Sequence, residues 1–214
     1  MRFLPLTITI ILFAGMLVWF GKIAYQKPAK TGTVTETVNL PLLTEPRITF
    51  VDPIRGNRDA TVTIVEFADY RCEFCKQEES VLREVLAAYS DEVRLVWKDF
   101  PNDYLNAQAS ASAAAARCAG QQSKYWEYHD LLFSRTGEAA LISYTDLAAS
   151  LGLDRTAFDN CLKTREMMPL VQKSLEEAQM LRLEGAPSFF INGRPFNGTG
   201  FEEFKIVIDG LLKK

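Results

Sequence analysis

Residues 62–75 read VTIVEFADYRCEFC, and this segment is the most informative part of the chain about its fold. Residues 61–68 are dominated by β-branched side chains, and we expect them to form a buried strand. Residues 72–89 predict a helix because their apolar side chains recur at helical spacing, and residues 93–97 predict a second strand. This order of strand, helix and strand sets a Cys-x-x-Cys pair at the junction of a buried strand and a helix N-terminus.

The two cysteines of this pair, Cys72 and Cys75, are predicted to lie on the first turn of the helix. Side chains at positions i and i+3 are neighbours there and can close a small disulfide ring. Free N–H groups and the helix dipole lower the pKa of the first thiol at a helix N-terminus. We therefore expect Cys72 to be the attacking thiolate and Cys75 to resolve the mixed disulfide, with a redox-active disulfide and no other cofactor.

Two other interpretations of the pair are a structural disulfide and half of a zinc site. Zinc would need two further ligands, but Cys118 and Cys161 form no second Cys-x-x-Cys pair, and His129 is the one histidine of the chain. We therefore expect no metal. His129 lies on a predicted helix and is most simply a surface or packing residue. A module that holds Cu(I) or another soft metal through Cys72 and Cys75 is an alternative function.

The 214 residues indicate one domain behind an N-terminal anchor. A net charge of −3 without a long basic run argues against a nucleic-acid partner. Residues 3–20 carry no charge, so residues 1–25 predict an uncleaved transmembrane or signal-anchor helix, although basic residues flank both of its ends and leave its orientation open. Residues 26–47, with three prolines, predict an extended linker. The domain should follow at 48–214, with a first strand near its start at 48–51.

The second half of the domain is predicted to be helical until a late hairpin. We expect a helical insertion at about residues 104–183, a hairpin at 188–196 and a closing helix at 200–212. A Gly-Ala-Pro sequence precedes the hairpin, and taken alone it is a common way to end a helix. Because the chain also carries a Cys-x-x-Cys pair, we expect a cis-Pro187 loop beside the disulfide, where the backbone of Ala186 pairs with an extended substrate.

Four further residues are candidates for tuning or stabilising the site. Glu66 and Lys98 interrupt otherwise apolar strands, and exposed edge positions are one interpretation of them. If both face inward, they form a buried charge pair that tunes Cys75 and relays protons to it. Cys118 and Cys161 lie on different predicted helices. They are either two unpaired core cysteines or, as we expect in an oxidising compartment, a structural disulfide.

The stretch at 62–75 resembles the active-site entry of DsbA-like thioredoxin-fold proteins, a family of thiol-disulfide oxidoreductases with membrane-anchored bacterial members. Segments similar to other parts of that family follow in the same order, namely WKDFP at 97–101, ARCAG at 116–120, YWEYHD at 125–130 and GAPSFFING at 185–193. The resemblance spans roughly residues 55–213. It implies an α/β thioredoxin-like fold with an inserted α-helical domain, here preceded by the predicted anchor helix.

The resemblance also implies roles for the residues singled out above. These are Cys72 as nucleophile, Cys75 as resolving thiol, Pro187 as cis-proline, Glu66 and Lys98 as a buried charged pair, and Cys118 and Cys161 as the second disulfide of some members. It implies a single-pass protein of the cell membrane whose catalytic domain is extracytoplasmic, on the periplasmic or outer surface. Its clients would be cysteine-containing proteins, and a membrane quinone-linked thiol oxidase would recycle it.

One position departs from the family pattern. Strong oxidants of this family usually carry a histidine before the second cysteine, whereas this chain has Phe74 there and Glu73 before it. A negative charge beside the thiolate raises its pKa and makes the disulfide harder to reduce. We expect a dithiol oxidase of moderate strength, with a disulfide reductase or isomerase as the alternative. Known isomerases of this fold are dimers with a substantial N-terminal domain, for which residues 26–47 are too short, so we expect a monomer.

Overall fold

The computed structural model describes residue 19, residues 41–137 and residues 143–213. One compact unit spans Leu40–Lys214, and the other, Met1–Asn39, includes only Trp19 among the described residues. The predicted anchor at residues 1–25, Trp19 excepted, and most of the predicted linker at 26–47 therefore lie outside the described residues. Within the part that is described, no helix has the length and apolar character needed to cross a membrane.

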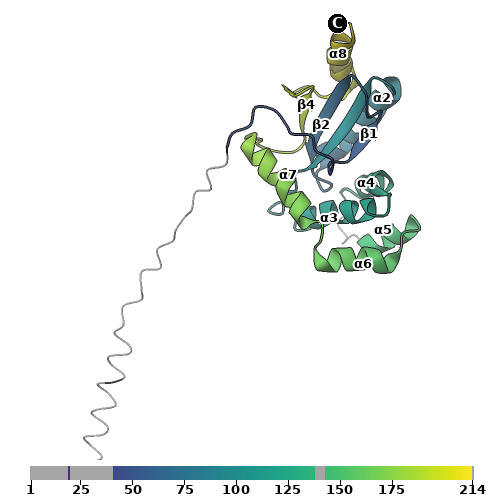
Figure 1. Cartoon of the computed structure of the whole chain (residues 1–214), viewed down its shortest axis with the longest axis vertical. Coiled ribbons are helices and arrows are strands. Elements are labelled where there is room, and N and C mark those ends of the chain that lie inside the picture. The colour runs from purple at the N-terminus through teal and green to yellow at the C-terminus, as the bar shows by residue number, and fades with distance from the viewer. Residues whose placement is uncertain (1–18, 20–40, 138–142, 214) are drawn as a thin grey trace, which may run out of the picture. The chain divides into compact units, whose positions relative to one another are not determined.

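A mixed sheet of five strands, counted within the described residues, has the order β1-β3-β2-β4-β5 (Figure 1). Its two central strands, β2 (Val62–Ala68) and β3 (Val93–Asp99), run parallel. The other pairings are antiparallel, with β1 (Ile54–Gly56) on β3, β4 (Ser188–Ile191) on β2, and β5 (Arg194–Phe196) on β4. Every residue of β2 is buried, which accounts for its nearly unbroken apolar run.

Helices cover both faces of this sheet. α2 (Glu73–Ala88) connects β2 to β3 and, together with α8 (Gly200–Leu212), covers the face that carries Ile64 and Leu95. α7 (Met168–Met180) covers the opposite face, where its Ala178 packs with Val65 and Phe67. Because side chains alternate along a strand, neighbouring residues of β2 belong to different cores.

The four helices that precede α7 lie together beside the sheet (Figure 1). They are α3 (Ala109–Gly120), α4 (Tyr125–Ser134), α5 (Tyr144–Ser150) and α6 (Arg155–Thr164). With α7 they occupy the chain between β3 and β4, the region where the helical insertion is predicted. α3 consists mainly of Ala and Ser, and these small side chains let it lie buried among its neighbours.

A disulfide joins α3 to α6. The Sγ atoms of Cys118 and Cys161 are 2.03 Å apart, their Cα atoms are 6.0 Å apart, and 43 positions separate them in the sequence. Both side chains are buried in the core that α3 shares with α4 and α6. Closing a loop of this length removes enough entropy from the unfolded chain to stabilise the fold by about 4 kcal/mol.

The predicted strand at residues 48–51 is wrong. Residues 50–52 form a turn instead, and the first strand is β1, a few residues later. The Asp52 carboxylate accepts hydrogen bonds from the backbone N–H of Thr49 at 2.6 Å and from its hydroxyl at 2.9 Å. Aspartate side chains that bond to nearby backbone in this way favour a turn over a strand.

Candidate active site

Cys72 is the N-cap residue of α2, and the turn that leads into this helix is organised by Asp69. The backbone carbonyl of Asp69 accepts from the Cys72 N–H at 3.1 Å, and its carboxylate accepts from the Arg71 N–H at 2.8 Å. The Cys72 Sγ in turn accepts a hydrogen bond from the Cys75 backbone N–H at 3.2 Å. The first sulfur thus occupies the place where a helix N-terminus presents its free N–H groups.

The two thiols differ in exposure and in acidity. Cys72 is half-buried and Cys75 is fully buried, and both are free thiols in this structure. A hydrogen bond from the Cys75 side chain, helped by the N–H groups of Cys75 and Phe74, lowers the pKa of Cys72 to about 7 against the opposing effect of burial. Burial first, and then the bond and charge of Cys72, raise the pKa of Cys75 far above the usual range of a thiol. Cys72 therefore forms the thiolate while Cys75 keeps its proton.

The loop before β4 brings Ala186 and Pro187 to the redox pair. The Ala186–Pro187 peptide bond is cis. The Cys72 thiol donates to the Ala186 carbonyl with a sulfur–oxygen distance of 3.6 Å. Strand β4 begins directly after this bond and pairs with β2, the strand that leads into α2, so two segments over a hundred residues apart meet at the active site.

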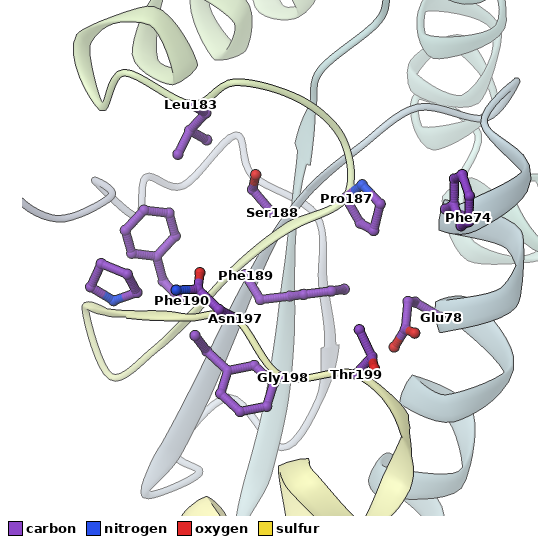
Figure 2. Close-up of a pocket in the computed structure, with 12 residues that line it drawn as sticks. Phe74, Glu78, Leu183, Pro187, Ser188, Phe189, Phe190, Asn197, Gly198 and Thr199 are labelled. Atoms are coloured by element: carbon purple, nitrogen blue, oxygen red, sulfur yellow. The ribbon is translucent and has the colours of Figure 1, made fainter.

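Two pockets are lined by residues of the α2 N-terminus or the cis-Pro loop. One, of about 360 Å³, lies between α2 and the β4–β5 hairpin (Figure 2). Phe74 on α2 and Pro187 directly before β4 both line it, and in the view of Figure 2 Phe189 lies between Pro187 and Thr199. Phe74 is 70% exposed, an unusual environment for a large apolar side chain. The other pocket, of about 480 Å³, is lined by Cys72 itself together with Ala186 and residues 100–105.

Glu66 lies fully buried on the α2 face of the sheet, behind the redox pair. Burial, followed by the negative charges of Glu79, Glu78 and Cys72, raises the pKa of Glu66 well above the usual range of a carboxyl group. Its charge acts in turn on Cys75, whose pKa it helps to raise. Neither oxygen of Glu66 has a hydrogen-bond partner among the described residues.

The predicted charge pair between Glu66 and Lys98 is wrong, although both side chains are buried. Glu66 lies opposite Trp97 in the register of β2 and β3, so Lys98, one residue further on, lies on the other face of the sheet. The Lys98 ammonium donates to the carboxylates of Asp52 and Glu177, each at 2.9 Å, and to the Arg47 carbonyl at 2.6 Å. Lys98 therefore ties the segment before β1 to α7 and does not contact Glu66.

Sequence reasoning missed two residues near the site, Glu79 and His129. Glu79 is 2% exposed on the face of α2 that carries Cys75 and Leu82, and a carboxyl group at an apolar position of an amphipathic helix is a signal that could have revealed it. His129 is fully buried, which confirms the packing alternative of its interpretation over the surface one. Its Nε2 lies 2.8 Å from Glu79 Oε1 and its Nδ1 lies 3.0 Å from the Tyr70 hydroxyl, so both ring nitrogens have partners other than a cation.

Comparison with known proteins agrees with this geometry. The family model described as Thioredoxin matches residues 49–210. The crystal structure of oxidised BdbD from Bacillus subtilis superimposes with a TM-score of 0.72 at 21% identity, covering 82% of this chain and 100% of that one. A thioredoxin-like oxidoreductase from Silicibacter pomeroyi DSS-3 superimposes with a TM-score of 0.69 at 28% identity, covering 78% and 95% of the two chains.

Curated relatives match the chain over only part of their own length. The Na(+)/H(+) antiporter NhaA 1 of Salinispora arenicola is 35% identical over 148 residues, which make up 69% of this chain and 22% of that protein. The chain thus spans about a fifth of the length of such relatives. The family model covers most of the chain, and the Cys-x-x-Cys pair, the cis-Pro loop and the inserted helices stand together in one fold. The chain therefore belongs to the thioredoxin family, and it carries a Cys-x-x-Cys pair at the N-terminus of α2.

Proposed function

We propose that this protein is a dithiol oxidase that transfers its Cys72–Cys75 disulfide to cysteine-containing proteins outside the cytoplasm. The observation that carries the proposal is the difference in exposure and acidity between the two thiols. Cys72 is accessible and has a pKa lowered to about 7, whereas Cys75 is buried and keeps its proton. A thiol with an acidity close to ambient pH is well suited both to attack a disulfide and to leave from one.

The reaction begins with the oxidised pair. A client thiolate attacks the Sγ of Cys72, a bond forms between the two sulfurs, and the Cys72–Cys75 bond breaks with its electron pair on Cys75. The Cys75 sulfur takes up one proton. A second client thiolate then attacks the client sulfur of the mixed disulfide, and Cys72 leaves as a thiolate. The client loses two electrons, and the enzyme gains them as its reduced pair.

Protonation of the Cys75 sulfur is the difficult step of this reaction. A thiolate in the environment of Cys75 is costly because burial raises the pKa of that group. Glu66 is the buried carboxyl group that, when ionised, helps to raise the pKa of Cys75, and burial raises its own pKa and so favours its protonated form. We assign Glu66 the role of proton donor, without the contribution of Lys98 that the sequence suggests.

The surroundings of Cys72 favour an extended client segment. The Ala186 carbonyl lies beside the Cys72 sulfur and precedes strand β4, so a client backbone can pair with it as an added strand. Phe74 offers an exposed ring at the edge of the pocket in Figure 2. Apolar side chains of a client that flank its reactive cysteine would bury themselves there.

We also propose a location at the cell membrane, with the catalytic domain on the extracytoplasmic side and a membrane quinone-linked thiol oxidase as recycling partner. The uncharged run at residues 3–20 supports an anchor. The Cys118–Cys161 disulfide supports an oxidising compartment. We also propose that the protein acts as a monomer.

The equilibrium redox potential of Cys72/Cys75 tests the direction of exchange. It should be titrated against glutathione in the folded unit, with Cys118 and Cys161 intact. A potential well above that of thioredoxin, about −270 mV, supports the oxidase. A potential near or below that value favours the alternative, a reductase that draws electrons from across the membrane, and the Cys72 pKa of about 7 makes this alternative worth testing first.

The roles of the two thiols are tested separately by trapping. In C75S the Cys72 thiolate should attack a disulfide-bonded client peptide and release one client thiolate, and the mixed disulfide should accumulate because the resolving sulfur is gone. C72S should give neither adduct nor turnover. If C72S still oxidised peptides, the proposed role of Cys72 would be contradicted.

A further inference from the structure

Behind the redox pair lies a buried cluster of three titratable groups that comes from three different elements. Glu66 belongs to β2, Glu79 to α2 and His129 to α4, and none is more than 2% exposed. His129 Nε2 contacts Glu79 Oε1 at 2.8 Å, and the negative charge of Glu79 acts on Glu66. Two carboxyl groups therefore share one buried site with one imidazole.

Such a site needs a positive charge or a shared proton, because two buried carboxylates repel each other and lose their hydration. Lys98 cannot supply the charge, since it lies on the other face of the sheet and is bound to Asp52 and Glu177. The basic group in contact with the cluster is His129. Its imidazole can hold a proton on either ring nitrogen and exchange one with Glu79 through the hydrogen bond at Nε2.

The far side of the imidazole is held by neutral groups. Nδ1 of His129 lies 3.0 Å from the Tyr70 hydroxyl, which lies 2.9 Å from the Tyr125 hydroxyl. Burial raises the pKa of both phenols, so they stay protonated and serve as donors or acceptors without adding charge. The rings of Trp97 and Trp126, each 4.8 Å from the imidazole between ring centroids, fix its position. The imidazole therefore lies between the neutral Tyr70 hydroxyl on one side and the Glu79 carboxyl group on the other.

We propose that the Glu79–His129 pair sets the charge of Glu66, and thereby proton delivery to Cys75, which makes Glu79 and His129 positioning residues of thiol exchange. When Glu79 is negative, Glu66 holds its proton more tightly; when His129 balances Glu79, this effect is reduced. The effect of this pair on the rate of thiol–disulfide exchange rests on the proposed function. The electrostatic coupling of Glu79 and His129 to Glu66 does not depend on that function.

Other charged and titratable groups face the cluster and belong to its electrostatic balance. On α2 and its N-cap these are Cys72, Cys75 and Glu78, and on α4 the Asp130 carboxylate lies within 4.8 Å of His129 and Glu79. Arg55 of β1 neutralises Asp130 through a 2.6 Å ion pair, and the ion pair of Asp99 with Arg117 faces Tyr125. Asp130 and Asp99 are each paired with an arginine, whereas Glu79 is paired with His129.

The test follows the carboxyl carbon of Glu66 by ¹³C NMR as a function of pH in the reduced protein. E79Q removes the negative charge but keeps an oxygen that can accept from His129, so Glu66 should release its proton at a pH lower by about one unit. H129Q removes the balancing base, so Glu66 should hold its proton to a higher pH. The double variant E79Q/H129Q should titrate like E79Q, because His129 acts through Glu79.

E84Q is the matched control. Glu84 lies on the same helix but is exposed, so the same substitution there should leave the Glu66 titration in place. Equal Glu66 midpoints in E79Q, H129Q and E84Q would overturn the inference, and so would a double variant that behaves like H129Q. If H129Q does not fold, E79Q against E84Q decides the question.

A kinetic readout connects the cluster to exchange. The pH above which peptide oxidation slows should move down in E79Q and up in H129Q, in step with the NMR midpoint. A purely structural role would lower stability without moving either profile. If the wild-type protein exchanges no disulfide at all, the proposed function fails, whereas the NMR titration still decides the coupling of Glu79 and His129 to Glu66.

Discussion

Glu66 and Lys98 are both buried in the central sheet, yet they lie on opposite faces of it. Glu66 faces α2 and the redox pair, whereas Lys98 faces α7 and binds Asp52 and Glu177. The two charges therefore serve different purposes. Glu66 belongs to the chemistry of Cys75, and Lys98 fastens the segment before β1 to the fold.

Replacing Lys98 by Met should cost stability and leave the redox pair unchanged. Removing one partner of a buried ion pair leaves the other charges uncompensated, so the free energy of unfolding should fall by about 3–5 kcal/mol. Urea unfolding measures this loss. The redox potential and the Cys72 titration of K98M should match those of the wild-type protein. A potential that differs by tens of millivolts would show that Lys98 does influence the redox pair.

Replacing Cys75 by Ala should raise the pKa of Cys72. The hydrogen bond from the Cys75 side chain is the largest cause that lowers this pKa to about 7, so without it the thiolate absorbance at 240 nm should appear at a higher pH. C75S keeps a hydroxyl donor and should show a smaller rise. An unchanged midpoint in C75A would leave the helix N-terminus as the source of the acidity.

The reduced protein should gain stability as pH rises through the Cys72 titration. The pKa of this thiol is about 7 in the folded protein and ~8.5 in an unfolded chain. Because the folded pKa is depressed, the contribution is full above the unfolded value and is lost as pH falls through about 7. Thermal unfolding of reduced wild-type protein and reduced C72A from pH 6 to pH 9 measures it, and parallel curves would contradict the prediction.

Replacing Phe74 by His should make the disulfide more oxidising. A histidine before the second cysteine stabilises the Cys72 thiolate, so the potential should rise by about 30 mV or more, which corresponds to ~1.4 kcal/mol. Titration against glutathione measures the change. F74A is the control, because it removes the exposed ring without adding a base, and it should keep the wild-type potential.

Removing the disulfide between α3 and α6 should weaken the fold and spare the chemistry. The variant C118A/C161A should unfold with a free energy lower by about 4 kcal/mol, because its unfolded chain regains the entropy of an open loop. Denaturant titration measures the loss. The Cys72/Cys75 potential should stay the same, since the bridge lies in the helical insertion, and a large change would show coupling between the two.

Features that depend on local pattern could be predicted from the amino-acid sequence. Residues 62–75 predict the buried strand, the helix N-terminus and the spacing of Cys72 and Cys75. They do so because strand propensity, helical periodicity and thiol spacing each involve only a few neighbouring residues. The Gly-Ala-Pro sequence likewise marked the loop of Pro187, which needed the Cys-x-x-Cys pair for its interpretation.

The pairing of the buried charges, by contrast, became visible in the folded chain. The register of β2 against β3 sets Glu66 opposite Trp97, and a shift of one residue would have placed Lys98 on the same face as Glu66. The pairing of His129 with Glu79 likewise depends on how α4 packs against α2, over a separation of 50 residues. Such contacts arise from the packing of distant segments, and no local pattern in either segment encodes its partner.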